Sequence, residues 1–250
     1  MRVFTVSDVH VDFGPNRQWV RQLSDFDYQR DLLIIAGDLT DNEQMLIETL
    51  SILKHKFQYV VFVPGNHETW LHCSRFSNSL EKFYWVLKVA TELGVITERV
   101  TLNGIDIVPL YSWYDYSFAP LNEQLEESWS DFRLCHWSMS TIDLAAHFHK
   151  MNEVTLREVV ECKWRISVSH FMPWIELLPD YIPKHLDYLW PVLGSTMLGE
   201  QVEQLRPDIH IYGHSHVNTK TMRNGIKYVN NAFGYPNERT RFSLLQLELI

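Results

Sequence analysis

The first third of the chain alternates between two hydrophobic patterns. Residues 2–7, 31–36 and 57–63 are short runs rich in apolar and β-branched residues, and each is followed by Asp, Gly or Pro, as strands often are. Between and after these runs, apolar residues recur at helical spacing around residues 19–23, 45–53 and 76–90. Strands that alternate with helices predict βαβ units and therefore an α/β fold with an at least partly parallel sheet.

The later part of the chain adds signals for antiparallel pairing. Asn103-Gly104 and Asn224-Gly225 are two-residue hairpin signals, and strand-like segments flank both of them. We also predict strands at residues 105–110, 164–169, 208–212 and 242–249, and a helix near residues 141–149. The sheet should therefore be mixed.

Aromatic residues are concentrated between residues 111 and 137. This segment cannot be a disordered linker, because disorder goes with few aromatic residues. We predict a folded insertion or cap at about residues 111–160. No repeat, low-complexity tract or Pro/Gly-rich linker divides the chain, so we expect one domain over residues 1–250.

Charge and cysteine usage exclude several classes of protein. The chain has 250 residues, with 22 Lys and Arg against 31 Asp and Glu, a net charge of −9. This balance argues against a protein that coats nucleic acid, because such binding neutralises phosphates with Lys and Arg. The three cysteines form no C-x-x-C pair, so we expect neither a disulfide framework nor a thiolate zinc site. No apolar run is long enough for a signal peptide or a membrane span, and we expect a cytoplasmic protein that does not bind membranes.

Polar clusters follow five of the predicted strands at their C-terminal ends. In open α/β sheets, ligands bind in the crevice beyond these ends. Asp, Asn and imidazole without thiolate suit Mn, Fe or Zn, and seven candidate ligands are too many for one four-coordinate ion but suit two. The clusters are Asp8-Val9-His10, Gly37-Asp38-Leu39-Thr40-Asp41, Gly65-Asn66-His67-Glu68, His170, and Gly213-His214-Ser215-His216.

The order D-x-H, G-D-x-x-D, G-N-H-E, a lone His and G-H-x-H resembles the calcineurin-like metallophosphoesterase superfamily. The resemblance implies a dinuclear hydrolase of phosphoric esters, with a four-layer α/β/β/α sandwich of two mixed sheets flanked by helices. It also implies two divalent or mixed-valence metal ions, with Mn, Fe or Zn as the candidates. The implied ligands are Asp8, His10, Asp38 and His216 for one ion, and Asp38, Asn66, His170 and His214 for the other.

The same resemblance suggests the catalytic residues. His67 resembles the family histidine that protonates the leaving group or stabilises the transition state. Asp41 matches the carboxylate that orients that histidine, although it could instead cap the helix that starts near Asn42. Glu68 is better explained as a supporting carboxylate than as a ligand.

The sequence also bears on the substrate. Protein Ser/Thr phosphatases of this superfamily carry Arg where this chain has Asn42, so a phosphodiester or a small phosphomonoester is favoured over a phosphoprotein. Trp113, Tyr114 and His136 are candidate substrate-binding residues. The alternatives are core packing for the two aromatic residues and a surface position on the cap for His136. Two other functions remain open: a nuclease, and a non-catalytic interaction module on the same fold.

Overall fold

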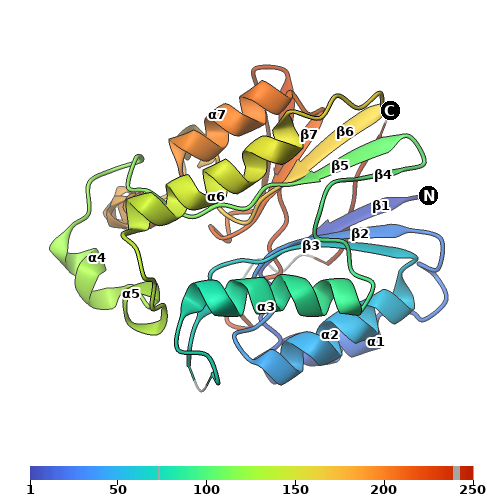
Figure 1. Ribbon diagram of the computed structural model, residues 1–250, viewed down its shortest axis with the longest axis horizontal. Coiled ribbons are helices and arrows are strands. Elements are labelled where there is room, and N and C mark those ends of the chain that lie inside the picture. The colour runs from blue at the N-terminus through green and yellow to red at the C-terminus, as the bar shows by residue number, and fades with distance from the viewer. Residues whose placement is uncertain (73, 239–242, 250) are drawn as a thin grey trace.

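The computed structural model describes residues 1–72, 74–238 and 243–249, and its strands form two mixed sheets (Figure 1). In the first sheet, strands β1 to β3 are parallel and β10 is antiparallel to β1. Its strand order is β10 (Leu245–Gln246), β1 (Val3–Val6), β2 (Leu32–Ala36), β3 (Tyr59–Val63).

In the second sheet, the four inner strands are parallel and the two edge strands, β4 and β8, are antiparallel to their neighbours. Its order is β4 (Val100–Leu102), β5 (Ile105–Pro109), β6 (Trp164–Val168), β7 (Ile209–Tyr212), β9 (Ile226–Asn230), β8 (Thr219–Arg223).

Both predicted hairpins are present. Asn103-Gly104 joins β4 to β5, and Asn224-Gly225 joins β8 to β9. Asn103 and Gly104 have φ of 52° and 79°, and Asn224 and Gly225 have φ of 50° and 81°. A two-residue hairpin needs positive φ at both positions, which Asn and Gly tolerate better than other residues do.

Helices cover the outer face of each sheet (Figure 1). Helices α1 (Gly14–Gln22), α2 (Glu43–Lys56) and α3 (Ser79–Glu92) lie on the first sheet, and α6 (Thr141–Leu156) and α7 (Thr196–Leu205) lie on the second. Alternate residues of β2 show the layering: Leu33 and Ile35 pack with the helices, whereas Leu32, Ile34 and Ala36 pack between the two sheets. The four-layer α/β/β/α sandwich is confirmed.

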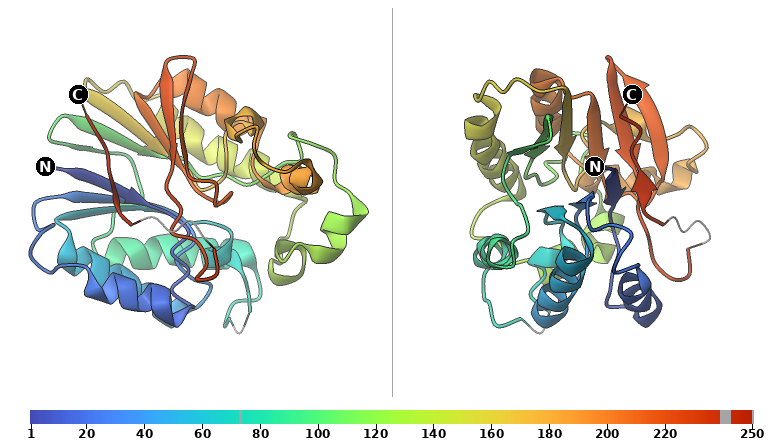
Figure 2. Two further views of the ribbon diagram at one scale, coloured as in Figure 1. Left: turned by 180° about the vertical axis from the view of Figure 1, so that it is seen from behind. Right: turned by 90° about the vertical axis from the view of Figure 1, so that its right-hand side faces the viewer.

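The aromatic-rich segment divides between two places. Its last part is α6, which belongs to the outer helical layer and extends beyond the predicted residues 141–149. The short helices α4 (Glu123–Ser128) and α5 (Asp131–Leu134) project at one end of the sandwich, where α4 contacts the 3-10 helix η3 (Lys184–Val192) (Figure 2). Two further 3-10 helices are η1 (His67–Thr69) and η2 (Ile175–Leu177).

Some predicted boundaries are displaced. The helix expected from residue 76 begins at Ser79, because the Asn78 side chain accepts the N–H groups of Leu80 and Glu81. The strand expected at residues 242–249 is reduced to β10 among the described residues, and residue 242 lies outside them. No helix in the described part of the chain is both long and apolar enough to cross a membrane.

Candidate metal centre

The seven predicted ligands meet where the C-terminal ends of the two sheets lie together. Asp8 and His10 follow β1, Asp38 follows β2 and Asn66 follows β3, all in the first sheet. His170 follows β6, and His214 and His216 follow β7, in the second sheet. The site therefore depends on the two sheets packing with their strand ends aligned.

The ligand atoms form two groups that share one neighbourhood. In one group, His216 Nε2 lies 3.2 Å from His10 Nε2 and 3.4 Å from Asp8 Oδ1. In the other, His170 Nε2 lies 3.2 Å from His214 Nδ1, 3.0 Å from Asn66 Oδ1 and 3.5 Å from Asp38 Oδ2. Asp38 also lies in a group with His10 and His67, so its carboxylate stands between the two.

Three imidazoles are held by the nitrogen that faces away from the cluster. His170 Nδ1 is 2.9 Å from the carbonyl oxygen of Ala36, and His214 Nε2 is 3.0 Å from that of Val192. His216 Nδ1 is 2.9 Å from the Glu238 carboxylate. Carbonyl and carboxylate oxygens accept hydrogen bonds, so these nitrogens carry the proton and the opposite nitrogens present lone pairs to the cluster.

This donor set fits metal cations. The lone pairs of His170 Nε2 and His214 Nδ1 and the Asn66 carbonyl oxygen are directed at one another, which is repulsive unless a cation lies between them. Imidazole and carboxylate ligands whose other atoms are hydrogen-bonded to the surrounding protein are characteristic of metal sites.

The pKa shifts of His10, His170, His214 and Asp38 agree with this interpretation, whereas the carboxylates of Asp8 and Glu238 outweigh burial and raise the pKa of His216 to about 10. Burial, with help from the nearby His216, lowers the pKa of His10 to about 3, so the ring is neutral, as a ligand must be. Burial likewise lowers the pKa of His170 and of His214. Burial and the neighbouring Glu68 and Asp8 raise the pKa of Asp38 well above its ordinary range, a repulsion between carboxylates that bound cations would relieve.

The backbone at the ligands is unusual. Five of the seven have left-handed φ values: Asp8 (52°), His10 (46°), Asp38 (56°), His214 (65°) and His216 (52°). Such conformations are uncommon for non-glycine residues and cluster at functional sites. Gly65 fits here because a Cβ atom would lie 2.2 Å from Asp38 Oδ1.

His67 lies at the edge of the cluster. Its Nε2 is 3.7 Å from Asp38 Oδ2, and its backbone N–H donates to Asp38 Oδ1 at 3.0 Å. Its ring stacks on the indole of Trp70. His67 also lines a cavity of about 460 Å³ that opens beside the cluster.

Asp41 has other neighbours than the sequence predicts. Its backbone carbonyl accepts from Lys82 Nζ at 2.6 Å, and its carboxyl group interacts with Asp12. The described residues show no contact between the carboxyl group of Asp41 and His67. The cap of α2 is provided one residue later by Asn42, which accepts from the N–H of Met45 at 3.0 Å.

The three candidate substrate-binding residues lie away from the cavity beside His67. Trp113 and Tyr114 are buried in the apolar core, where both rings contact Phe171. His136 is exposed, and its backbone N–H and C=O bond to Ser79. The structure thus places the first two in the packing role and the third at the surface.

The cavity walls are instead aromatic, apolar and neutral polar groups that the sequence did not single out. Among the described residues, none of those lining it is Lys or Arg, and its charged side chains besides Asp38 are limited to Glu238 and any protonated histidine. The walls beyond the cluster include Trp70, Trp129, Tyr188, Leu189, Leu193 and Tyr235.

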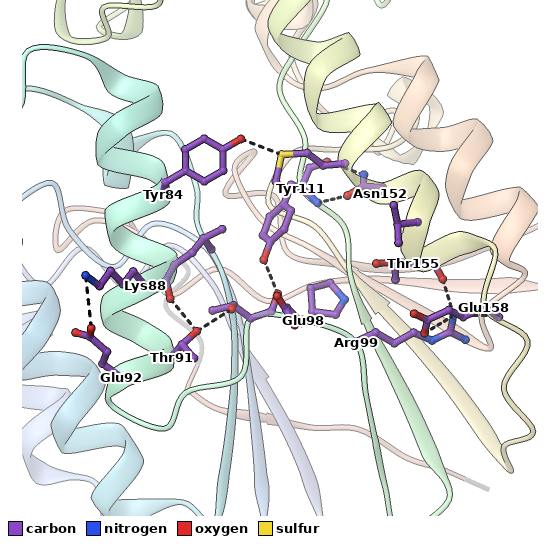
Figure 3. Close-up of a pocket in the computed structure, with 15 residues that line it drawn as sticks. Tyr84, Lys88, Thr91, Glu92, Glu98, Arg99, Tyr111, Asn152, Thr155 and Glu158 are labelled. Carbon is purple, nitrogen blue, oxygen red and sulfur yellow. Dashed lines mark hydrogen bonds and ion pairs between the residues drawn. The ribbon is translucent and has the colours of Figure 1, made fainter.

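A larger cavity of about 680 Å³ lies between α3 and α6 (Figure 3). Tyr84 and Lys88 of α3 face Asn152 and Thr155 of α6 across it, with Tyr111 beside Asn152 and Arg99 beside Glu158. It contains none of the seven clustered ligands, so size alone does not locate the chemistry.

Two carboxylates support the cluster without belonging to it. Glu68 is fully buried and accepts the backbone N–H groups of Asp38, Leu39, Thr40 and Gly65 at 2.6–3.1 Å. It thereby ties the loop after β2 to the loop after β3, which confirms its supporting role. Glu238, which holds His216, was not predicted, because it stands outside every recognisable motif.

Groups of Asp and His side chains that could hold metal ions lie at the strand ends of a four-layer sandwich, the arrangement expected of a metal-dependent phosphoesterase. Residues 1–218 match the model of the calcineurin-like phosphoesterase family, and the chain belongs to that family. It is therefore a hydrolase of phosphoester bonds, and the family implies a dinuclear divalent metal centre.

Comparisons with two known proteins describe the similarity. The [acyl-carrier-protein] phosphodiesterase PptH of Mycobacterium tuberculosis is 25% identical over 264 residues, covering 96% of this chain and 79% of the relative. The crystal structure of phosphopantetheinyl hydrolase PptH from that organism has a TM-score of 0.82 at 24% identity and covers 98% of this chain and 95% of that one. A Vps29 structure from Entamoeba histolytica has a TM-score of 0.40 at 14% identity and covers 100% of this chain and 86% of that one.

Proposed function

We propose that this chain hydrolyses a phosphodiester in preference to a phosphomonoester. The observation that carries the proposal is the lack of Lys and Arg among the described residues of the cavity wall. A phosphomonoester carries about −1.5 to −2 charges at neutral pH, whereas a diester carries one. Without a guanidinium or ammonium group on the described part of the wall, and with the Glu238 carboxylate on it, the second negative charge has no partner among the described wall residues.

We propose the metal ligands as two sets that share Asp38. Asp8, His10, Asp38 and His216 would hold one ion, and Asp38, Asn66, His170 and His214 the other. The two groups of converging lone pairs support this assignment. Nitrogen and oxygen donors without sulfur favour Mn, Fe or Zn. When bound, such a pair activates water and neutralises charge on the phosphoryl group.

His67 is the proposed acid for the leaving alcohol. Its ring lies between the cluster and the cavity, and Trp70 holds the ring plane. Its backbone N–H donates to Asp38, so the same contact fixes the loop that carries it. Burial lowers the pKa of His67 well below its usual range, so the neutral ring would stabilise the alcohol oxygen that leaves toward the cavity wall by donating an N–H hydrogen bond to it, and a phosphoester bound beside the ring would have to raise that pKa before a proton could be transferred.

For the substrate, we propose the class that the relative's name indicates, a phosphopantetheinyl diester of an acyl carrier protein. A pantetheinyl arm is uncharged, and the neutral wall formed by Trp129, Tyr188, Leu189 and Leu193 suits an uncharged chain. The net charge of −9 does not favour a polyanionic nucleic acid in its place.

The test compares bis-p-nitrophenyl phosphate with p-nitrophenyl phosphate on protein stripped of metal and refilled with Mn²⁺. We expect faster hydrolysis of the diester, and a preference for the monoester would contradict the proposal. Release of phosphopantetheine from a loaded carrier protein then tests the substrate class. If the protein hydrolyses bis-p-nitrophenyl phosphate but releases no phosphopantetheine from the carrier protein, the proposed substrate class is wrong and the diester preference stands. The same assays on His67→Ala control for contaminating phosphatase.

A further inference from the structure

Asp131 is a buried carboxylate that links the aromatic-rich segment to the metal cluster. It is the first residue of α5, its exposed fraction is 2%, and it lies 65 residues from Asn66 in the sequence. Asp131 Oδ1 accepts from Asn66 Nδ2 at 2.9 Å and from Trp70 Nε1 at 2.6 Å. Asp131 Oδ2 accepts from Trp129 Nε1 at 2.9 Å. Within the described chain, no Lys or Arg pairs with this carboxylate.

The first contact decides which atom of Asn66 faces the cluster. A side-chain amide has nearly the same shape in both orientations, so hydrogen-bond partners determine its orientation. Because a carboxylate only accepts, the Asn66 NH₂ group must face Asp131, and Oδ1 must face His170 and His214. The reverse orientation would direct an N–H group at the cation.

The other two contacts fix groups around the reacting centre. The bond from Trp70 holds the indole on which the His67 ring stacks, and the bond from Trp129 holds part of the opposite cavity wall. One carboxylate thus holds a proposed metal ligand, the support of the proposed acid, and a wall of the cavity.

We infer that Asp131 is a positioning residue for metal binding, so that the segment around it is part of the active site and not a separable cover. The inference rests on the proposed function for the ligand role of Asn66. It requires no particular substrate.

The test measures Mn²⁺ binding to the stripped protein by calorimetry, which does not depend on activity. Asp131→Asn keeps the shape of the side chain but leaves one acceptor oxygen, which cannot accept both from Asn66 and Trp70 on one side and from Trp129 on the other. We expect its Mn²⁺ affinity to fall 10- to 100-fold, the usual effect of removing a hydrogen-bond partner of a metal ligand. Asp115→Asn is the matched control: this carboxylate lies in the same segment and accepts from Ser195, away from the cluster. Its affinity should stay within twofold of wild type.

A reversed pair separates positioning from general stability. Asn66→Asp alone sets two carboxylates against each other and should also weaken Mn²⁺ binding. The double variant Asn66→Asp/Asp131→Asn restores the hydrogen bond with donor and acceptor exchanged, and we expect it to bind at least tenfold more tightly than Asn66→Asp. The inference would be overturned if the double variant lost as much Mn²⁺ affinity as the two single variants together. It would also be overturned if folded Asp131→Asn bound Mn²⁺ with wild-type affinity. If Asp131→Asn does not fold, Asp131→Glu, which displaces the carboxylate by one methylene, replaces it in the same comparison.

These outcomes are separable from the proposed function. Wild-type protein that binds Mn²⁺ but prefers the monoester refutes the diester proposal and leaves the positioning role intact. Diester hydrolysis as proposed, with unchanged Mn²⁺ affinity in Asp131→Asn, refutes only the positioning role.

Discussion

The imidazole of His67 lies flat against the indole of Trp70, with the ring centroids 3.7 Å apart and the planes inclined by 29°. This stacking leaves Nε2 of the ring 3.7 Å from Asp38 Oδ2, in a residue that lines the cavity. The orientation of the proposed acid is therefore set by packing as well as by the chain to which it is attached.

Replacing His67 should separate catalysis from metal binding. We expect His67→Ala to keep its metal content and to lose about 10²–10⁴-fold in kcat on a diester, the usual contribution of a positioned acid or base. Metal analysis and steady-state kinetics on the same preparation check this. Loss of metal in proportion to activity would show instead that His67 acts as a ligand.

Replacing Asp38 should have the opposite signature. Its carboxylate groups with His170 and His214 on one side and with His10 and His67 on the other, so Asp38→Ala should lower the bound metal below two ions and abolish activity. Asp12→Ala is a suitable control, because Asp12 accepts from the Thr40 hydroxyl and belongs to neither group. Unchanged metal stoichiometry in Asp38→Ala would refute a bridging position.

Glu68 should contribute to the stability of the fold, because its carboxylate accepts four backbone N–H groups. In Glu68→Gln, an NH₂ group replaces one acceptor oxygen and faces buried backbone N–H groups. An unsatisfied buried donor costs about 1–3 kcal/mol, so we expect a loss of at least about 2 kcal/mol in the free energy of unfolding. Urea denaturation measures this, with the exposed Glu48→Gln as the control. Equal midpoints for the two variants would contradict the prediction.

His210 should give stability a pH dependence that does not involve the cluster. Burial lowers its pKa from 6.5 to about 3, and Ser167 and Ser169 contact its two ring nitrogens. Between pH 6.5 and 3 the unfolded chain binds a proton that the folded chain does not. The free energy of unfolding should therefore fall as the pH falls, by up to about 1.4 kcal/mol per pH unit from this group. Denaturation of the wild type and of His210→Gln across this range measures the difference in slope, and parallel curves would contradict the prediction.

Local patterns explain what the sequence could predict. The Asn-Gly hairpins and the apolar strand runs carry their structural cause within a few residues. The strand-end position of the polar clusters was likewise sufficient to predict that the seven proposed ligands lie together, because parallel strands end at the same edge of a sheet.

The missing parts depend on partners that are distant in sequence. Asp131 contacts residues 61 and 65 positions away, and nothing in its own segment distinguishes a buried acceptor from an exposed helix start. Trp129 lines the cavity whereas Trp113 is buried in the core, and irregular segments have no periodicity that could tell the two apart. For Asp41, the match to the family motif predicted a contact with His67, but the carboxyl group of Asp41 interacts with Asp12 instead.

The five left-handed ligands have a consequence for how this chain can change over time. Each such backbone costs on the order of 1 kcal/mol in a residue with a Cβ atom, and glycine would avoid that cost. A descendant that no longer needed the reaction could exchange these residues for glycine and gain folding stability. This chain has Asp or His at all five positions, so it carries a backbone cost that glycine would remove, together with the side chains that the proposed chemistry needs.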